Sequence, residues 1–433
     1  MYLRPRKLLH SIGYLFSIGL MISISINGQA AEQLTINAAI DEALAGNPGL
    51  ATIEARAKAM VEIPSQVNSL PDPQLSLNIA NLPLDSLSFT QEGMTQFQIG
   101  ITQALPYPGK LALRSQVANQ EAQAAVSMVA ERQLQLVLDV KTLWWNIFYL
   151  DRALSVIVRN QNLLKQIINV AETRYQVGQG LQQDILLAQL ELSKLRDSAI
   201  QFHNQRDNEV VQLNVLLDRP VDRAILLPSS VTESLPDLMN KEDLQQLAWS
   251  SRPLLEQQRV LMGAARSRVD LAKKGYGPDF QVGAVYGMRN GSNPDGSHRA
   301  DFGSVLFSMN MPLYASSKQD RMVDQRHAEW MEQKYYLHDQ RNQVASQVQQ
   351  AIINYRRAAE RVVLFQLEII PQANQTVDAT LAGYQVGKVD FLSLLRSQTT
   401  LYDYETQYWQ AFSNANQSLA RLIAAVGEEK VYE

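Results

Sequence analysis

Four charged residues flank a tetrapeptide that the chain contains twice, and they are the side chains best placed to do chemistry. Tyr-Gln-Val-Gly occurs at 175–178 and again at 384–387. The charged residues beside the two copies are Arg174, Asp184, Lys388 and Asp390. Charge gathered at a turn between helices can form a switchable contact or a docking surface, because ionic groups attract or repel over several ångströms. Alternatively, these residues are ordinary solvated charges near helix ends. The sequence leaves both interpretations open.

The sequence contains no recognisable catalytic motif. Gly109-Lys110 follows a proline and is typical of a helix start rather than a phosphate-binding loop. There is no cysteine, which excludes disulfides, thiolate metal sites and a lipid-modified N-terminal cysteine. The histidines beyond the first thirty residues are scattered: His203, His298, His327 and His338. We therefore predict no enzyme, no cofactor and no metal site, and the net charge of -4 gives no reason to expect nucleic acid.

The first thirty residues have the composition of a secretory signal. Three basic residues precede an apolar stretch at 8–26, and Gly-Gln-Ala at 28–30 offers small residues to a signal peptidase. We expect cleavage after Ala30, with a permanent membrane anchor as the alternative. No later stretch has the run of about 18 apolar residues that a transmembrane helix needs.

The elements that would position the charged residues come from a chain that repeats itself. Four landmarks recur in one order, 205, 205, 206 and 209 residues apart. They are Asn47-Pro48 with Arg252-Pro253, Pro73 with Pro278, Leu105-Pro106 with Met311-Pro312, and the two copies of Tyr-Gln-Val-Gly. This order predicts a tandem duplication. We expect a signal peptide over 1–30, a first repeat over 31–240 and a second repeat over 241–433.

Each repeat predicts a helix, two short strands, a long helix, a tight turn at Val-Gly and a returning helix. The first helix is expected at 35–70, and its counterpart at 241–274. Residues 111–177 lack glycine and proline, and this length gives a helix of about 100 Å. Apolar residues step by four and three from Leu136 to Ile157, as in a coiled coil. The other long runs without glycine or proline are 181–219, 313–370 and 388–426.

Four short segments alternate between apolar and polar residues, a pattern typical of β-strands. They lie at 74–80, 97–102, 280–288 and 305–311. Their lengths approach the roughly ten residues of a membrane-spanning strand. Four strands cannot close a barrel, and an open edge in lipid leaves backbone groups unpaired. Three chains would supply twelve strands, so the sequence favours a trimer, with two soluble hairpins as the alternative.

Taken together, these motifs resemble the TolC-like outer-membrane efflux proteins over essentially the whole chain after the signal. The heavy-metal-efflux branch, of the CzcC and CusC kind, is the most similar. The residues that carry the resemblance are Pro71-Asp72-Pro73-Gln74-Leu75, the segment from Gln103 to Lys110, Arg174-Tyr175-Gln176-Val177-Gly178 with Asp184-Ile185-Leu186, and the segment from Tyr384 to Leu392.

The resemblance implies a mainly α protein with a small membrane β portion. Three copies would form a 12-stranded barrel in the outer membrane and an α-helical tunnel across the periplasm. The partners implied are a periplasmic membrane-fusion protein, an inner-membrane efflux pump and outer-membrane lipid. Residues 217–244 and the tail after Val426 would form an equatorial belt, and the helix at 35–70 would stack above the one at 181–219.

The resemblance also makes the two Val-Gly turns the periplasmic tips, where the tunnel is gated and the fusion protein docks. The candidate site residues are Arg174, Tyr175, Gly178, Asp184, Tyr384, Gly387, Lys388 and Asp390. Family members often narrow the pore with acidic residues nine and twelve positions after the second tyrosine. Ser393 and Arg396 hold those positions here, so an acidic gate of that form is not expected.

The function that follows is a passive exit duct, which conducts metal cations, or alternatively drugs, from an inner-membrane pump to the outside. The sequence does not identify the cargo, because a wide tunnel need not bind what it passes. The alternative from another class is a structural or adaptor-like coiled-coil envelope protein with soluble hairpins.

Overall fold

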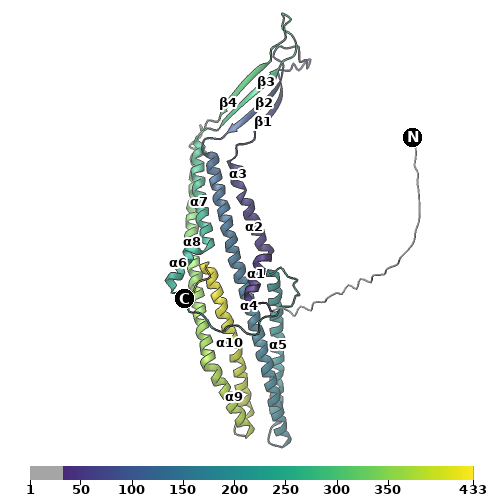
Figure 1. Cartoon of the computed structure of the whole chain (residues 1–433), viewed down its shortest axis with the longest axis vertical. Helices are drawn as coiled ribbons and strands as arrows, with labels where there is room; N and C mark the ends of the chain where they lie inside the picture. Colours follow the sequence, from purple (N-terminus) through teal and green to yellow (C-terminus); the bar gives the residue numbers. More distant parts are fainter. Residues whose placement is uncertain (1–32, 433) are drawn as a thin grey trace, which may run out of the picture.

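The computed structural model describes residues 33–432, so the predicted signal peptide lies outside the described residues. The molecule is elongated (Figure 1): a small sheet forms one end, long helices form the body, and two helical hairpins form the other end. Within the described residues no helix is both long and apolar enough to cross a membrane.

The two halves of the chain run through similar elements in the same order. The first contains α1 (Ile36–Gly46), α2 (Pro48–Val61), α3 (Ile63–Asn68), β1 (Gln74–Ala80), β2 (Gln96–Leu105), α4 (Lys110–Gln176) and α5 (Gln182–Leu216). The second contains α6 (Lys241–Ser251), α7 (Pro253–Lys273), η1 (Lys274–Tyr276), β3 (Phe280–Met288), β4 (Phe302–Met309), α8 (Gln319–Leu364), η2 (Phe365–Ile369), α9 (Ile370–Gln385) and α10 (Phe391–Val426). The long helix expected at 111–177 is confirmed as α4, which has 67 residues.

Proline divides the first helix of each half, where the sequence predicted one unbroken helix. Asn47 and Arg252 have extended backbones, with ψ of 117° and 116°. The proline that follows each of them disfavours the helical conformation at the preceding residue. A second break, at Glu62, separates α2 from α3. The expectation of one helix over 35–70 and one over 241–274 was therefore wrong in detail.

Asn47 turns the first of these breaks into a joint between two helices. Its side-chain oxygen accepts a hydrogen bond from the backbone N–H of Leu50 at 2.9 Å, which caps α2. Its side-chain nitrogen donates to the carbonyl of Leu216 at 3.0 Å, at the end of α5. One side chain thereby satisfies two orphaned helix-end groups, and α2 stacks end to end on α5 as expected (Figure 1).

The helix predicted over 313–370 differs from the structure at both ends. It begins at Gln319, six residues later, and continues through the π-helical turn η2 into α9. Pro371 is the second residue of α9. A wider π turn just before a proline accommodates the missing N–H without ending the helix. The second long helix therefore reaches the tip despite its proline.

The four strands form one antiparallel sheet in the order β1-β2-β3-β4, rather than two separate hairpins. Directly paired residues share a face of a sheet. One row of paired residues is apolar: Leu75, Ile101, Ala284 and Val305. The next row is mostly polar or small: Ser76, Gly100, Val285 and Ser304. The register therefore gathers the apolar residues on one exposed face.

The alternation predicted that the fourth strand ends at Met311, but β4 ends at Met309. Pro312 follows Met311, and a proline has no N–H to donate to a ladder and restricts the residue before it. Among the described residues, the outer edges of β1 and β4 have no strand partner.

The core at mid-length surrounds two aromatic side chains of α4. Trp144 stacks on Phe148 with ring centroids 5.6 Å apart, and its indole N–H donates to the Leu34 carbonyl at 2.9 Å. The expected belt lies at this level: the backbone N–H of Met239 donates to the carbonyl of Val431 at 3.1 Å. The chain before α6 is thus tied to the C-terminal tail, and the mainly helical fold with a small β portion is confirmed.

Candidate functional site at the helical tips

The two copies of Tyr-Gln-Val-Gly form the same backbone turn at the ends of α4 and α9. Gly178 and Gly387 have φ of 73° and 74°, in the left-handed region that glycine adopts without strain. The backbone N–H of Gly178 donates to Tyr175, and that of Gly387 to Tyr384, both at 3.0 Å. The next backbone N–H groups, of Gln179 and Lys388, donate to the carbonyls of Arg174 and Gly383. Both helix ends are therefore Schellman caps. The tetrapeptide therefore encodes a helix stop.

The structure brings three of the predicted site residues together across the two tips. The Arg174 guanidinium donates to the carbonyl of Tyr384 and lies 4.7 Å from the centre of its ring. The Tyr384 hydroxyl points to Asp184 at 3.4 Å, a long hydrogen bond. Arg174 and Asp184 belong to the first hairpin and Tyr384 to the second. This Arg174–Tyr384–Asp184 contact therefore connects the two hairpins within one chain.

Tyr384 is the buried centre of this contact. It is 3% exposed and meets the ring of Phe391 edge to face at 5.4 Å. Burial, and then the negative charge of Asp184, raise the pKa of the Tyr384 phenol, while Arg174 opposes the rise. The phenol is therefore a neutral donor at physiological pH. Tyr175, its counterpart in the first copy, is 48% exposed and takes no part in the contact.

The remaining candidates lie on the surface of the second tip. Lys388 is exposed, and Asp390 is the N-cap of α10. The Asp390 carboxylate accepts hydrogen bonds from the backbone N–H and the hydroxyl of Ser393, at 2.9 and 2.7 Å. These bonds lower its pKa. Arg396 is exposed one turn further along α10.

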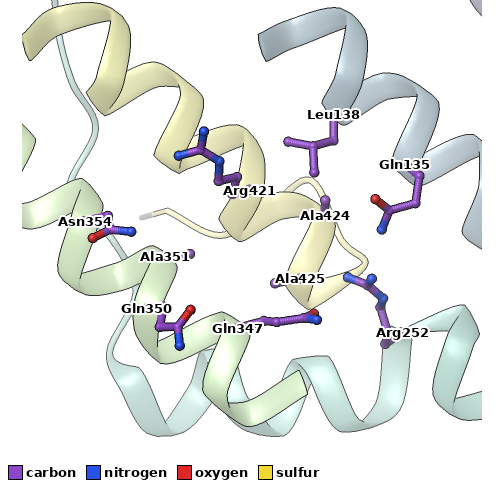
Figure 2. A pocket seen from close by; sticks show the side chains of 10 residues that line it. All are labelled: Gln135, Leu138, Arg252, Gln347, Gln350, Ala351, Asn354, Arg421, Ala424 and Ala425. Carbon is purple, nitrogen blue, oxygen red and sulfur yellow. The ribbon is translucent and has the colours of Figure 1, made fainter. Parts of the chain in front are cut away.

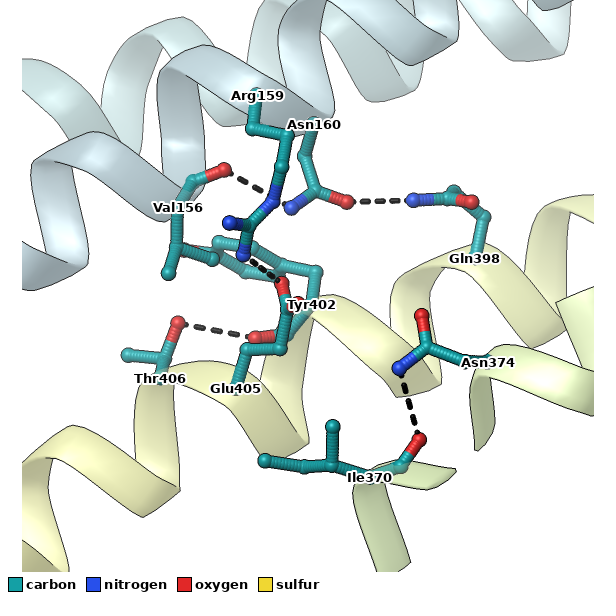
Figure 3. Close-up of polar contacts among 9 residues, drawn as sticks. All are labelled: Val156, Arg159, Asn160, Ile370, Asn374, Gln398, Tyr402, Glu405 and Thr406. Atoms are coloured by element: carbon teal, nitrogen blue, oxygen red, sulfur yellow. Dashed lines mark hydrogen bonds and ion pairs between the residues drawn. The ribbon is translucent and has the colours of Figure 1, made fainter. Parts of the chain in front are cut away.

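Sequence reasoning missed a buried polar seam that joins α4 to α10 above the tips (Figure 3). The Gln398 amide donates to the Asn160 side-chain oxygen, and both residues are buried. Nearby, the Arg159 guanidinium lies 2.7 Å from the Glu405 carboxylate. The sequence does contain a sign of these polar contacts, because the apolar stripe of α4 is interrupted between Ile157 and Leu164. Polar groups in a helix seam fix the register of the pair.

An elongated helical body with a sheet that exposes one apolar face at its far end defines a class: outer-membrane channels with a periplasmic helical part. The model of the family described as "Outer membrane efflux protein" matches residues 39–218 and 244–428. The chain belongs to this family. It is an outer-membrane efflux channel of the TolC kind, with its helices in the periplasm, and the family is one of ducts rather than enzymes.

Relatives agree with this assignment. The outer membrane protein TolC of Vibrio cholerae serotype O1 is 22% identical over 405 residues, which cover 89% of each chain. The solved structure of CusC superposes with a TM-score of 0.78 at 16% identity, over 91% of this chain and 92% of that one. VceC from Vibrio cholerae gives 0.76 at 17% identity, over 91% and 96%. These structures show that the fold is shared, and the resemblance inferred from the motifs is confirmed at the level of the family.

Proposed function

We propose that three copies of this chain form the outer-membrane exit duct of a tripartite efflux system. The observation that carries the proposal is the sheet. Its apolar residues gather on one exposed face, and β1 and β4 have unpaired outer edges among the described residues. Lipid tolerates an apolar face but not an unpaired edge. Three four-stranded sheets joined edge to edge would close a twelve-stranded barrel and satisfy both conditions.

We propose further that the tips gate the helical tunnel and dock a periplasmic fusion protein, which connects the duct to an inner-membrane pump. The Arg174–Tyr384–Asp184 contact supports the gate, because it adds polar bonds between the two hairpins at their tips, beside an apolar cluster that both hairpins share. Exposed apolar residues at the turns support the docking surface: Tyr175, Val177, Leu181 and Val386. Lys388 beside them adds an exposed charge. The division into repeats at 31–240 and 241–433 also remains a proposal.

The proposed cargo is metal cations, with drugs as the alternative. The basis is the resemblance of the segments at 71–75, 103–110 and 384–392 to the heavy-metal-efflux branch. Deletion of the gene should raise the sensitivity of the cell to metal salts, and the wild-type gene should restore growth. Sensitivity to drugs with unchanged metal tolerance would favour the alternative cargo and leave the duct intact.

The sheet supplies a direct test of the duct with a matched pair of variants. Val305 is 89% exposed on the apolar face, and Ser304 is its neighbour on the other face. A charge facing lipid at mid-depth costs about 2–4 kcal/mol. Val305→Arg should sharply reduce the trimer that is recovered from outer membranes, whereas Ser304→Arg should assemble. Equal assembly, or a stable inserted monomer measured by light scattering in mild detergent, would contradict the trimeric barrel.

A further inference from the structure

We propose that the chain has a binding site for a small oxyanion, a carboxylate or a phosphate, at mid-length, where α10 ends beside the start of α7. A pocket of about 240 Å³ lies there between α4, α8 and α10 (Figure 2). Two guanidinium groups, of Arg252 and Arg421, line it. The site is far from the tips, and the inference does not depend on what the duct exports.

Arg252 supplies the central observation. Its side chain is only 3% exposed, and two of its nitrogens bind the Glu131 carboxylate at 2.7 and 2.9 Å. Its third nitrogen, Nη1, is buried and has no hydrogen-bond partner. A buried N–H group without an acceptor is costly, and more so in a charged group. The group lines the pocket and points into it (Figure 2), so an acceptor placed there would remove the cost.

The charged side chains that line the pocket favour an anionic ligand. Glu131 already neutralises Arg252, whereas Arg421 makes only a long hydrogen bond of 3.4 Å to the Gln417 amide. No aspartate or glutamate lines the pocket within residues 33–432. Four side-chain amides complete the polar lining: Gln135, Gln347, Gln350 and Asn354. A small oxyanion would balance the positive charge of Arg421. It would also accept hydrogen bonds from the unpaired Arg252 N–H and from the side-chain amides.

The equivalent joint in the first half of the chain shows why the pocket is open here. Asn47 occupies the position of Arg252, and both of its side-chain polar atoms are bonded, to Leu50 and Leu216. In the second joint Arg252 binds Glu131 of α4 instead, and its Nη1 group has no hydrogen-bond partner. The replacement of asparagine by arginine thus converts a closed joint into one with an unfilled donor.

Calorimetry of the full-length trimer in detergent tests the site. Sodium acetate and sodium phosphate are titrated separately at constant ionic strength, which is balanced with sodium chloride. We expect saturable binding of at least one of them, with one site per chain. Arg421→Gln should weaken it about tenfold, as the loss of a charged hydrogen bond implies. Arg252→Lys, which can still pair with Glu131, should also weaken it.

Arg357→Gln is the matched control, because Arg357 is exposed on α8 and paired with Glu360 outside the pocket. Its binding should equal that of the wild type. The absence of saturable binding by both anions, or binding that Arg421→Gln and Arg252→Lys leave unchanged, would overturn the proposal. Neither result would affect the export function, which is measured separately by growth on metal salts.

Discussion

At the first tip, Tyr175 stands in solvent with 48% of its surface exposed, whereas at the second tip Tyr384 is 3% exposed and holds the hairpins together. Both tyrosines open the same tetrapeptide, and both turns have the same backbone. A repeated motif therefore specifies the turn, while the residues around it specify what the turn does. One copy takes part in the contact between the hairpins, and the other lies on the surface.

The flanking residues show how the two tips diverged. Arg174 precedes the first tyrosine, and Gly383 precedes the second. Two residues after Gly178 and Gly387 the order of large and small residues is reversed, with Gly180 in the first tip and Val389 in the second. A Cβ on Gly383 would lie 2.5 Å from a Val389 methyl group, and a Cβ on Gly180 would lie 3.0 Å from the Cβ of Arg174. Each turn thus pairs one large residue with one glycine, in opposite order.

Removing the ring of each tyrosine in turn should give the largest difference in stability between the two tips. Tyr384→Ala should destabilise the closed tips by about 3 kcal/mol, since it empties a buried aromatic site. Tyr175→Ala should change their stability by less than about 0.5 kcal/mol, as for an exposed residue. Hydrogen exchange of tip peptides, measured by mass spectrometry on the trimer, compares the two. Equal protection in both variants would mean that the tips do not differ as described.

Both turns should respond alike to the loss of their glycine. Gly178→Val or Gly387→Val forces a β-branched residue into a left-handed conformation, at a cost of about 1–2 kcal/mol or more. Export should be lost while the trimer still assembles, because the sheet lies at the other end of the molecule. Asparagine tolerates this conformation, so Gly178→Asn is the control that should retain export. Normal export by both valine variants would show that export does not need these turns.

The start of the returning helix is a smaller point of difference between the tips. Asp390 caps α10 through its side chain, whereas Leu181 offers α5 no such bond. Asp390→Ala should speed amide exchange in the first turn of α10, and Leu181→Asp should slow it in the first turn of α5. If neither substitution alters exchange at its own helix, the cap does not stabilise the tip.

The smallest expected effect is the pH dependence of that cap. The Ser393 hydroxyl and backbone N–H lower the pKa of the Asp390 carboxyl from its usual value of 3.8. Its stabilising contribution is therefore present above about pH 4 and is lost as the pH falls through the lower folded value. The difference in exchange between wild type and Asp390→Ala, compared at one pH at a time, should persist at neutral pH and vanish in strong acid. A difference that is independent of pH would exclude the carboxylate as its source.

Much of this fold could be predicted from the sequence, because its signals are local. A run of 67 residues without glycine or proline gives α4, and alternation gives the four strands. The sequence left the pairing of β2 with β3 open between one barrel and two separate hairpins. The break at Asn47 depends on one proline and was missed. The unequal tyrosines could not be predicted, since burial depends on which hairpin lies opposite. The buried Asn160–Gln398 pair likewise joins residues 238 positions apart.

Single-channel conductance in a planar bilayer measures whether the contact between the tips closes the duct. In the proposed duct, the Arg174–Tyr384–Asp184 contact between the two tips holds the tunnel closed. Arg174→Ala removes the guanidinium from Tyr384, and Lys388→Ala removes an exposed charge outside that contact. The purified wild type should form channels, Arg174→Ala should conduct more, and Lys388→Ala should match the wild type. An absence of channels would contradict the duct, and equal conductance in Arg174→Ala and wild type would contradict the proposed gate.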